Sequence, residues 1–306
     1  MKLLTFADGE LTRAGCVLED SRILDVTAAW DACDHPLRAL DAPRDVLGLI
    51  ALGDQADVVL PLLLQAARMA PDAPVLDADG LSILAPIPRP GKNIFCVGRN
   101  YRAHIIEGNI ARGRDSESFP KAAEFFTKPP TAVVGHRAGV SRHAQHTNML
   151  DYEVELGIVI GKAGQDISPD AAMDHVYGYT IVNDITARDL QALHGQWFKG
   201  KALDGSCPIG PVVALKSSVP DPGALTLELS VNGELRQSAS TSDLLFDIPS
   251  IIAQLSAGMT LEPGDIIATG TPSGVGFAMD PPRSLEPGDV ISARIESIGE
   301  LINTIV

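Results

Sequence analysis

Acidic side chains occupy alternate positions at the start of "DYEVELGIVI", residues 151–160. Side chains alternate across a β-strand, so Asp151, Glu153 and Glu155 would share one face with Gly157 and Val159 further along. A solvated edge strand would explain the acids but not the apolar continuation. Two partly buried carboxylates about 7 Å apart repel each other unless one is protonated or a cation lies between them. The pattern therefore indicates a site for a divalent metal ion.

A third carboxylate, Asp184, follows a strand-like run in "YGYTIVNDITARDLQ", residues 177–191. Three carboxylates provide hard oxygen ligands that suit Mg²⁺, Mn²⁺ or Ca²⁺ better than zinc, and they leave positions open for water or substrate. Asp184 could also cap a helix, which does not exclude ligation. Arg188 and Gln191 follow at helical spacing, so we expect both on the side of Asp184, with Arg188 as a counter-ion or substrate clamp.

A histidine and a glutamate lie three residues apart in "NYRAHIIEG". In a helical turn His104 and Glu107 would face the same way, so the carboxylate could orient the imidazole. The polar, turn-rich stretch that follows, "GNIARGRDSESFPKAAEF", predicts a lid over the site. The alternative is a surface loop with an incidental histidine.

The glycine-rich stretch "ATGTPSGVG", residues 268–276, follows a strand-like run. It lacks the Gly-Lys-Ser/Thr ending of a P-loop and the GxSxG frame of a nucleophile elbow. Its backbone N–H groups and Thr271 could hold a carboxylate, although a tight turn alone would also explain the glycines. We interpret the HxxH pair His143 and His146 as surface structure, and Cys207 as a small buried residue rather than a nucleophile.

Two units are expected to position these groups, a small N-terminal α+β domain over residues 1–88 and a catalytic domain over residues 89–306. The first begins with strands in "LLTFADGELTRAGCVLEDSRILDV" and continues with helices in "RDVLGLIALG" and "ADVVLPLLLQAARMA". The prolines of "LAPIPRPGKN" predict a stiff linker at the boundary.

Short strand-like runs separated by Gly, Pro and Asp turns predict an α+β, β-rich fold for the second unit. Asn232-Gly233 indicates a hairpin turn, and "LFDIPSIIAQLSAGM" indicates a helix that ends at Gly258. The related stretches "LEPGDIIA" and "LEPGDVIS" predict two turns that each begin a strand of the same sheet.

Composition limits the class of protein. The chain has 306 residues, 45% of them hydrophobic, which is enough for a large core. Its formal net charge of −15 disfavours nucleic acid and anionic membranes as partners. The four cysteines are far apart in the sequence, which argues against a zinc knuckle. The apolar run "VVLPLLL" is too short to span a bilayer, and the start shows no signal-peptide pattern, so we expect a cytoplasmic protein.

Six motifs together resemble the fumarylacetoacetate hydrolase family, in the family order over roughly residues 91–306. They are "VGRNYRAHIIEG", "FFTKPPTAVVG", "DYEVELGIVIGK", "GYTIVNDITARDLQ", "GKALDGSCPIGP" and "GDIIATGTPSGVG". The resemblance implies a mixed β-sandwich roll, a homodimer, and Mg²⁺ or a similar ion, Mn²⁺ or Ca²⁺, held by Glu153, Glu155 and Asp184. The region before residue 88 matches only as the variable small domain of many relatives.

The resemblance also implies roles for the remaining site residues. His104 with Glu107 would activate water, and Lys201 in "KGKALDG" would neutralise an oxyanion or hold the substrate carboxylate. Thr271 would lie near the acid end of the substrate. Substrate-binding roles also fall to Arg188 and Gln191, whereas Lys128 has no role that we assign beyond lying near the site.

The activity expected from this set is hydrolysis of a C–C bond in an acylpyruvate or 2,4-diketo acid, with a small anionic 2-oxo acid as substrate. The alternatives are oxaloacetate decarboxylation and hydration or isomerisation of a 2-oxo-alkenoate at the same site. An alternative of another class is a non-catalytic protein that binds a metal or ligand.

Overall fold

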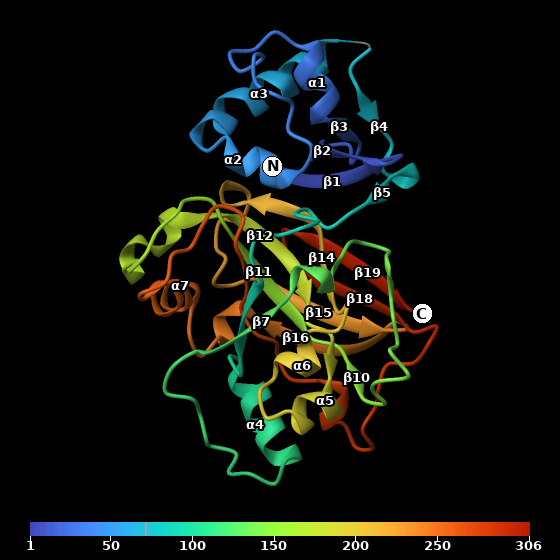
Figure 1. Cartoon of the computed structure of the whole chain (residues 1–306), viewed down its shortest axis with the longest axis vertical. Coiled ribbons are helices and arrows are strands. Elements are labelled where there is room, and N and C mark those ends of the chain that lie inside the picture. Colours follow the sequence, from blue (N-terminus) through green and yellow to red (C-terminus); the bar gives the residue numbers. More distant parts are fainter. Residues whose placement is uncertain (71) are drawn as a thin grey trace.

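A large mixed sheet runs from the N-terminal unit through the rest of the molecule (Figure 1). The computed structural model describes residues 1–70 and 72–306. The principal strand order is β4-β3-β2-β1-β14-β12-β11-β17-β6-β7, with β5 paired to β1 and β8 to β14. Its strands are β1 (Lys2–Asp8), β2 (Leu11–Val17), β3 (Ile23–Asp25), β4 (Val75–Leu76), β5 (Ser82–Ile83), β6 (Ile94–Gly98), β7 (Glu124–Lys128), β8 (Val133–Val134), β11 (Val154–Ile160), β12 (Val176–Asn183), β14 (Cys207–Leu215) and β17 (Ile266–Ala268).

A second sheet packs against the large one and contains the C-terminal strands. Its order is β16-β15-β18-β19-β9, and a separate two-stranded ladder joins β10 to β13. These strands are β9 (Gly139–Val140), β15 (Thr226–Val231), β16 (Glu234–Ser240), β18 (Val290–Ile295), β19 (Gly299–Ile305), β10 (Leu150–Asp151) and β13 (Thr186–Ala187). The chain is thus a strand-rich α+β protein, as the sequence predicted.

The helices lie at both ends of this arrangement (Figure 1). In chain order they are α1 (Val26–Ala32), α2 (Val46–Ala51), α3 (Asp54–Met69), α4 (Arg102–Ala111), α5 (Arg188–Leu193), α6 (Phe198–Lys201) and α7 (Ile248–Ser256). Helices α1, α2 and α3 belong to the N-terminal unit, α4, α5 and α6 lie toward the opposite end of the molecule, and α7 lies at an edge of the larger unit. Among the described residues, none of these helices combines the length and apolarity needed to cross a bilayer.

Strand β11 is buried along its whole length because its two faces contribute to different parts of the core. Leu156 and Ile158 pack with residues of the second sheet, whereas Val159 packs with Val182 and with the apolar residues of the N-terminal helices. The face that carries Glu155 therefore becomes core two positions beyond Gly157, as the sequence pattern predicted. Burial on both faces makes the register of β11 rigid, which fixes where its acidic side chains stand.

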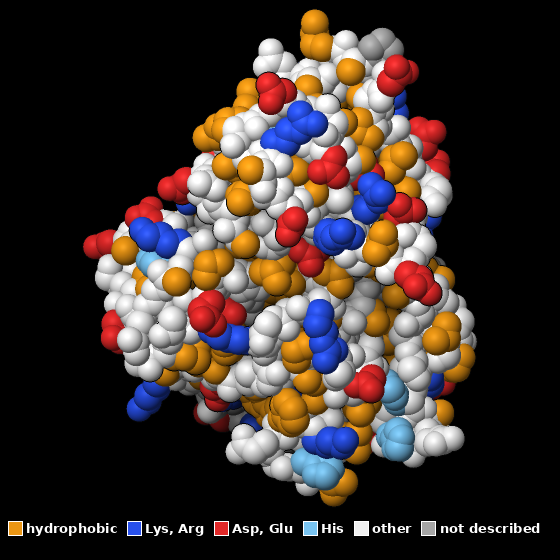
Figure 2. Space-filling model, turned by 45° about the horizontal axis from the view of Figure 1, so that its top comes forward, with side chains coloured by type: hydrophobic (Ala, Val, Ile, Leu, Met, Phe, Trp, Pro, Cys, Tyr) orange, Lys and Arg blue, Asp and Glu red, His pale blue; other side chains and the backbone are white. Residues whose placement is uncertain are grey.

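The N-terminal unit shares the large sheet, since β1 pairs antiparallel with β14 through Lys2↔Ala214 and Leu3↔Val213. The predicted boundary at residue 88 stays a prediction. On the surface, acidic and basic side chains are interspersed on the face shown in Figure 2 rather than gathered by sign.

The hairpin and the helix predicted from turn residues are present. Asn232 and Gly233 join β15 to β16 with φ of 52° and 80°, and α7 ends before Gly258, which has φ of 71°. The prediction that the two "LEPGD" stretches begin strands of one sheet was wrong. The first leads to β17, which pairs with β11 and β6, and the second leads to β18 in the other sheet. A shared turn sequence determines where a strand begins, but not which partner it meets.

Candidate metal centre and active site

Three carboxylates from two neighbouring strands converge at one end of the large sheet. Glu153 immediately precedes β11, Glu155 lies within it, and Asp184 follows β12. The strands pair antiparallel with Val154 opposite Asn183, so the start of one meets the end of the other. One oxygen of each carboxylate lies within 4.8 Å of the others, and all three side chains are buried. The sequence-predicted trio is thus brought together in one place.

Cations surround two members of the trio. Lys201 Nζ lies 2.7 Å from Glu153 Oε2 and 2.6 Å from Asp184 Oδ2. Lys128 Nζ lies 2.8 Å from Asp184 Oδ1 and donates to the carbonyl of Ile185. Burial acts to raise the pKa of Glu153, but the charges of Lys201 and Arg188 outweigh it and hold this pKa below its usual range. Glu153 is therefore held in its anionic form by these neighbouring cations.

Glu155 has a different electrostatic environment. It forms no ion pair within the described residues, and its Oε2 accepts a hydrogen bond from the N–H of Gly270 at 2.8 Å. Burial, followed by the charges of Asp184 and Glu153, raises the pKa of Glu155 well above its ordinary value. A buried, crowded carboxylate beside two anionic ones fits a hard divalent cation, which would replace the proton on Glu155. The three carboxylates therefore provide oxygen ligands that suit Mg²⁺ or Mn²⁺.

Metal binding is expected to release protons wherever the pH lies below the raised pKa of Glu155, because Glu155 must lose its proton to ligate. The affinity should rise with pH as long as the pH lies below the raised pKa of Glu155. Calorimetric titration with Mn²⁺ in two buffers of different ionisation enthalpy measures the release. Glu155→Gln, which has no proton to lose, is the matched control. Equal proton release by the wild type and this variant would contradict the assignment.

Arg188 lies beside the trio as a buried counter-ion. Its Nη2 is 2.6 Å from Glu153 Oε1, and its Nε is 2.9 Å from Asp151 Oδ2. Gln191 contacts Arg188 at 3.4 Å. The prediction that Asp184 and Arg188 lie on one side of the same helix was wrong, because α5 begins at Arg188, after the short strand β13. For the same reason Asp184 does not cap this helix. Arg188 reaches the site through the bend before α5.

His104 and Glu107 lie one turn apart on α4, with Nδ1 of the histidine 3.5 Å from Oε2 of the glutamate. Neither of these two buried atoms has a hydrogen-bond partner elsewhere in the described chain. The other oxygen of Glu107, Oε1, accepts the N–H of Gly274 at 2.9 Å. The pair is thus oriented as expected, and it is also tied to the glycine-rich loop.

Backbone N–H groups of the glycine-rich loop donate hydrogen bonds to carboxylates of the protein itself. Gly270 donates to Glu155, Gly274 to Glu107, and both Gly276 and Phe277 to Asp151. The expected cradle of free N–H groups for a substrate carboxylate is therefore not the arrangement observed at these residues. Gly270 has φ of 103°, and a Cβ there would come within 2.8 Å of the Asn100 side chain. These glycines let the loop approach the acids closely.

A cavity of about 820 Å³ opens over the trio. Predicted site residues that line it are His104, Glu153, Glu155, Arg188, Gln191, Lys201 and Thr271. Asp184 and Glu107 are not part of this lining. The HxxH pair lies elsewhere, with His143 Nε2 2.9 Å from the carbonyl of Asp204. Burial raises the pKa of the Cys207 thiol to about 12, consistent with a structural role.

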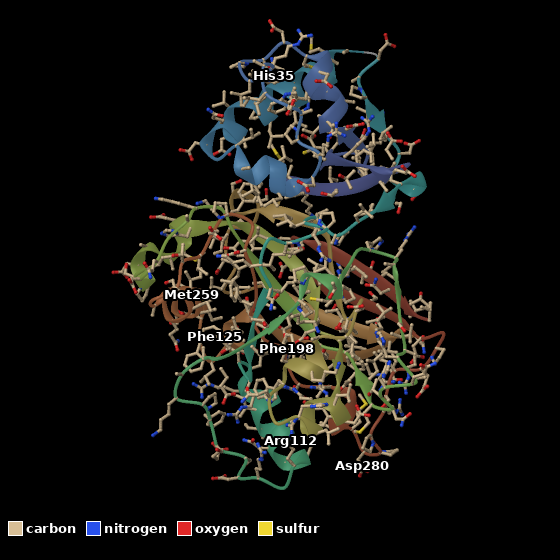
Figure 3. All side chains as sticks on the ribbon, in the orientation of Figure 1. His35, Arg112, Phe125, Phe198, Met259 and Asp280 are labelled. Atoms are coloured by element: carbon tan, nitrogen blue, oxygen red, sulfur yellow. The ribbon has the colours of Figure 1, made fainter. Side chains whose placement is uncertain are left out.

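Several residues around the cavity escaped sequence reasoning. The ring of Phe277 lies beneath two guanidinium groups, 4.6 Å from Arg112 and 4.5 Å from Arg188. Figure 3 shows Arg112 on the side of α4, at the end of the molecule opposite the N-terminal unit. Asp151 anchors both Arg188 and the loop. The stretch "ARGRD" after the histidine was a cationic signal that could have identified Arg112.

Comparison with known proteins identifies the relatives of this arrangement. The family model described as "Fumarylacetoacetate (FAA) hydrolase C-terminal" matches residues 93–306. The chain belongs to the fumarylacetoacetate hydrolase family. Oxaloacetate tautomerase YisK from Bacillus subtilis (strain 168) is 47% identical over 309 residues, which cover 99% of this chain and 100% of that protein. The protein is therefore an enzyme of this family.

Solved structures of family members have the same fold. Fumarylacetoacetate hydrolase (EaFAH) from psychrophilic Exiguobacterium antarcticum matches with a TM-score of 0.82 at 42% identity, covering 100% of this chain and 99% of that one. Maleylpyruvate hydrolase from Sphingobium sp. SYK-6, in complex with manganese (II) ion and pyruvate, matches with a TM-score of 0.75 at 33% identity, covering 100% and 99%. A manganese complex in a relative and the carboxylate trio here together support a divalent metal.

Proposed function

We propose that this enzyme interconverts the keto and enol forms of oxaloacetate, with Mg²⁺ or Mn²⁺ bound by Glu153, Glu155 and Asp184. The site observation that carries the proposal is a cavity lined by Glu153 and Glu155 of the trio and by Arg112, which forms no ion pair with an acid among the described residues. Whole-length similarity to an oxaloacetate tautomerase supports this choice among the reactions of the family. We therefore place tautomerisation ahead of hydrolysis, which the sequence had favoured.

Arg112 suits the distal carboxylate of a small dicarboxylic acid. Its guanidinium donates to the carbonyl of Gly108 at 3.1 Å and lies over Phe277, and within the described residues it forms no ion pair with an acid. Partial burial, followed by the nearby charge of Arg188, lowers its pKa from the ordinary value, so an anion beside it would be favourable. A dicarboxylate could thus place one end at the trio and the other at Arg112.

Enolisation moves a proton between C3 of oxaloacetate and the keto oxygen. Nδ1 of His104 faces Glu107, so Nε2 is the ring nitrogen left to move the proton, from C3 to the keto oxygen in enolisation and from the enol oxygen to C3 in ketonisation. When bound, a divalent ion supplies Lewis-acid stabilisation of the negative charge that develops on the keto oxygen. Burial alone would lower the pKa of Lys201, but Asp184 and Glu153 outweigh it and raise this pKa. Lys201 therefore stays cationic and helps to hold an anionic substrate.

A second candidate is hydrolysis of a C–C bond in an acylpyruvate-type acid. The observation that favours it is the His104–Glu107 pair, which could equally deprotonate a water molecule, and a maleylpyruvate hydrolase is among the structural relatives. Oxaloacetate decarboxylation would use the same metal site without a water attack. The expected homodimer and cytoplasmic location stay predictions.

The test follows the ultraviolet absorbance of enol oxaloacetate as it converts to the keto form, with and without Mn²⁺. We expect the protein to accelerate this conversion, and His104→Gln to slow it by ~10²–10⁴-fold, the usual contribution of a positioned acid–base group. His146→Gln, an exposed histidine outside the cavity, is the matched control. Pyruvate release reports decarboxylation, and acylpyruvate cleavage reports hydrolysis. Failure of the wild type to accelerate ketonisation would overturn the proposal.

A further inference from the structure

A single buried amide connects the glycine-rich loop to the metal-bearing strand. Gln237 lies on β16 in the second sheet and is 0% exposed. Its Oε1 accepts the backbone N–H of Val154, between the two glutamates of the trio, at 3.0 Å. Its Nε2 donates to the carbonyl of Pro272 and to Thr271 Oγ1, both at 2.8 Å. Three segments distant in sequence thus meet at this side chain.

The orientation of this amide is fixed chemically at both ends. The N–H of Val154 can only donate, so the atom facing it must be the oxygen of Gln237. The carbonyl of Pro272 can only accept, so the atom facing it must be the nitrogen. A flipped amide would place donor against donor and acceptor against acceptor. The two hydrogens on Nε2 therefore go to Pro272 and to Thr271.

This assignment determines the role of the Thr271 hydroxyl. Because Oγ1 accepts from Gln237, the hydrogen of the hydroxyl must be donated in another direction. No protein acceptor for that hydrogen occurs among the described residues, and Thr271 lines the cavity above the trio. The cavity therefore presents a hydrogen-bond donor at this point, and that donor suits an anionic oxygen rather than an N–H group, which can only donate.

We propose that Gln237 is a positioning residue that holds the Thr271 hydroxyl as a donor to an anionic oxygen of the substrate. The inference rests on the proposed function in so far as Thr271 touches a 2-oxo acid. It extends that function because Gln237, a residue of the second sheet outside the cavity lining, would determine which substrate atoms the Thr271 hydroxyl can bind. The same amide sets the spacing between Thr271 and the strand that carries Glu153 and Glu155.

The test measures oxalate binding to the Mn²⁺-loaded protein by calorimetry. Gln237→Glu keeps an acceptor for Val154 but has at most one hydrogen to donate where glutamine has two, so Thr271 is no longer held as an acceptor. We expect Gln237→Glu and Thr271→Val each to weaken oxalate binding about tenfold, the scale of one hydrogen bond to a charged group. The double variant should be no weaker than either single one, and Thr271→Ser should retain wild-type affinity. Mn²⁺ affinity should change less than about threefold, since no ligand of the trio is altered.

The proposal would be overturned if the double variant lost oxalate affinity by the product of the two single losses. An unchanged oxalate affinity in Gln237→Glu would also overturn it. If Gln237→Glu does not fold, Thr271→Val and Thr271→Ser decide the matter, because equal oxalate affinities in these two variants would exclude a donated hydroxyl hydrogen. Oxalate binding requires no turnover. The pattern can therefore hold even if oxaloacetate proves not to be the substrate, and a failed tautomerase assay is distinguishable from a failed positioning role.

Discussion

Asp184→Asn is expected to eliminate measurable Mn²⁺ binding and to lower kcat/KM by ~10³-fold or more, about 4 kcal/mol of transition-state stabilisation. Asp184 is fully buried and provides one of the three clustered carboxylates. Its two oxygens also face Lys128 and Lys201 at 2.8 and 2.6 Å. Asparagine keeps the shape but removes the charge that a divalent ion and both ammonium groups require.

Calorimetry with Mn²⁺ and the ketonisation assay measure the two effects of Asp184→Asn. Asp170→Asn, an exposed acid on the same chain and outside the cavity, is the matched control and should behave as the wild type. The loss of the Asp184 charge should also bring the pKa of Glu155 down, because that charge is one of the causes that raise it. A variant that binds Mn²⁺ with wild-type affinity would remove Asp184 from the set of ligands.

Arg188→Met is expected to lower the free energy of unfolding by ~3–5 kcal/mol, because it leaves buried Asp151 without its counter-ion and Glu153 with Lys201 alone. The guanidinium lies 2.9 Å from Asp151 and 2.6 Å from Glu153, and all three side chains are buried. Chemical denaturation without added metal measures the loss. Asp151→Asn combined with Arg188→Met should restore part of the stability by removing one uncompensated charge.

The loss in Arg188→Met should depend on pH in a defined direction. Arg188 helps to depress the pKa of Glu153, so this acid contributes stability above the ordinary glutamate range and loses that contribution as pH falls through its folded pKa. The difference between wild type and variant should therefore be largest at neutral pH and should shrink in acid. A difference below about 1 kcal/mol at neutral pH would mean that the ion pairs contribute little.

Local spacing was sufficient to find the trio and the histidine pair. Glu153 and Glu155 lie two residues apart at the start of β11, and His104 and Glu107 share one helical turn, so short-range geometry determines both arrangements. Asp184 was found because it ends a strand that must pair with the first. The fold class followed from the density of strand and turn signals.

The rest depends on contacts between segments far apart in the chain. Gln237 meets Val154 across 83 residues, and Asp151 meets Gly276 across 125. No periodicity within either segment indicates such a partner. The sequence also could not show that the loop amides bind protein carboxylates, since a glycine-rich stretch looks the same whether its N–H groups are free or occupied. The choice between tautomerisation and hydrolysis was equally inaccessible, because the same side chains can serve both reactions.

Glu107 holds two partners at once, the imidazole of His104 through one oxygen and the N–H of Gly274 through the other. A displacement of α4 that widened the mouth of the cavity would break the second interaction and release the glutamate that aligns the first. The same movement would then admit substrate and misalign His104. Glu107 therefore links the alignment of the base to the position of the glycine-rich loop.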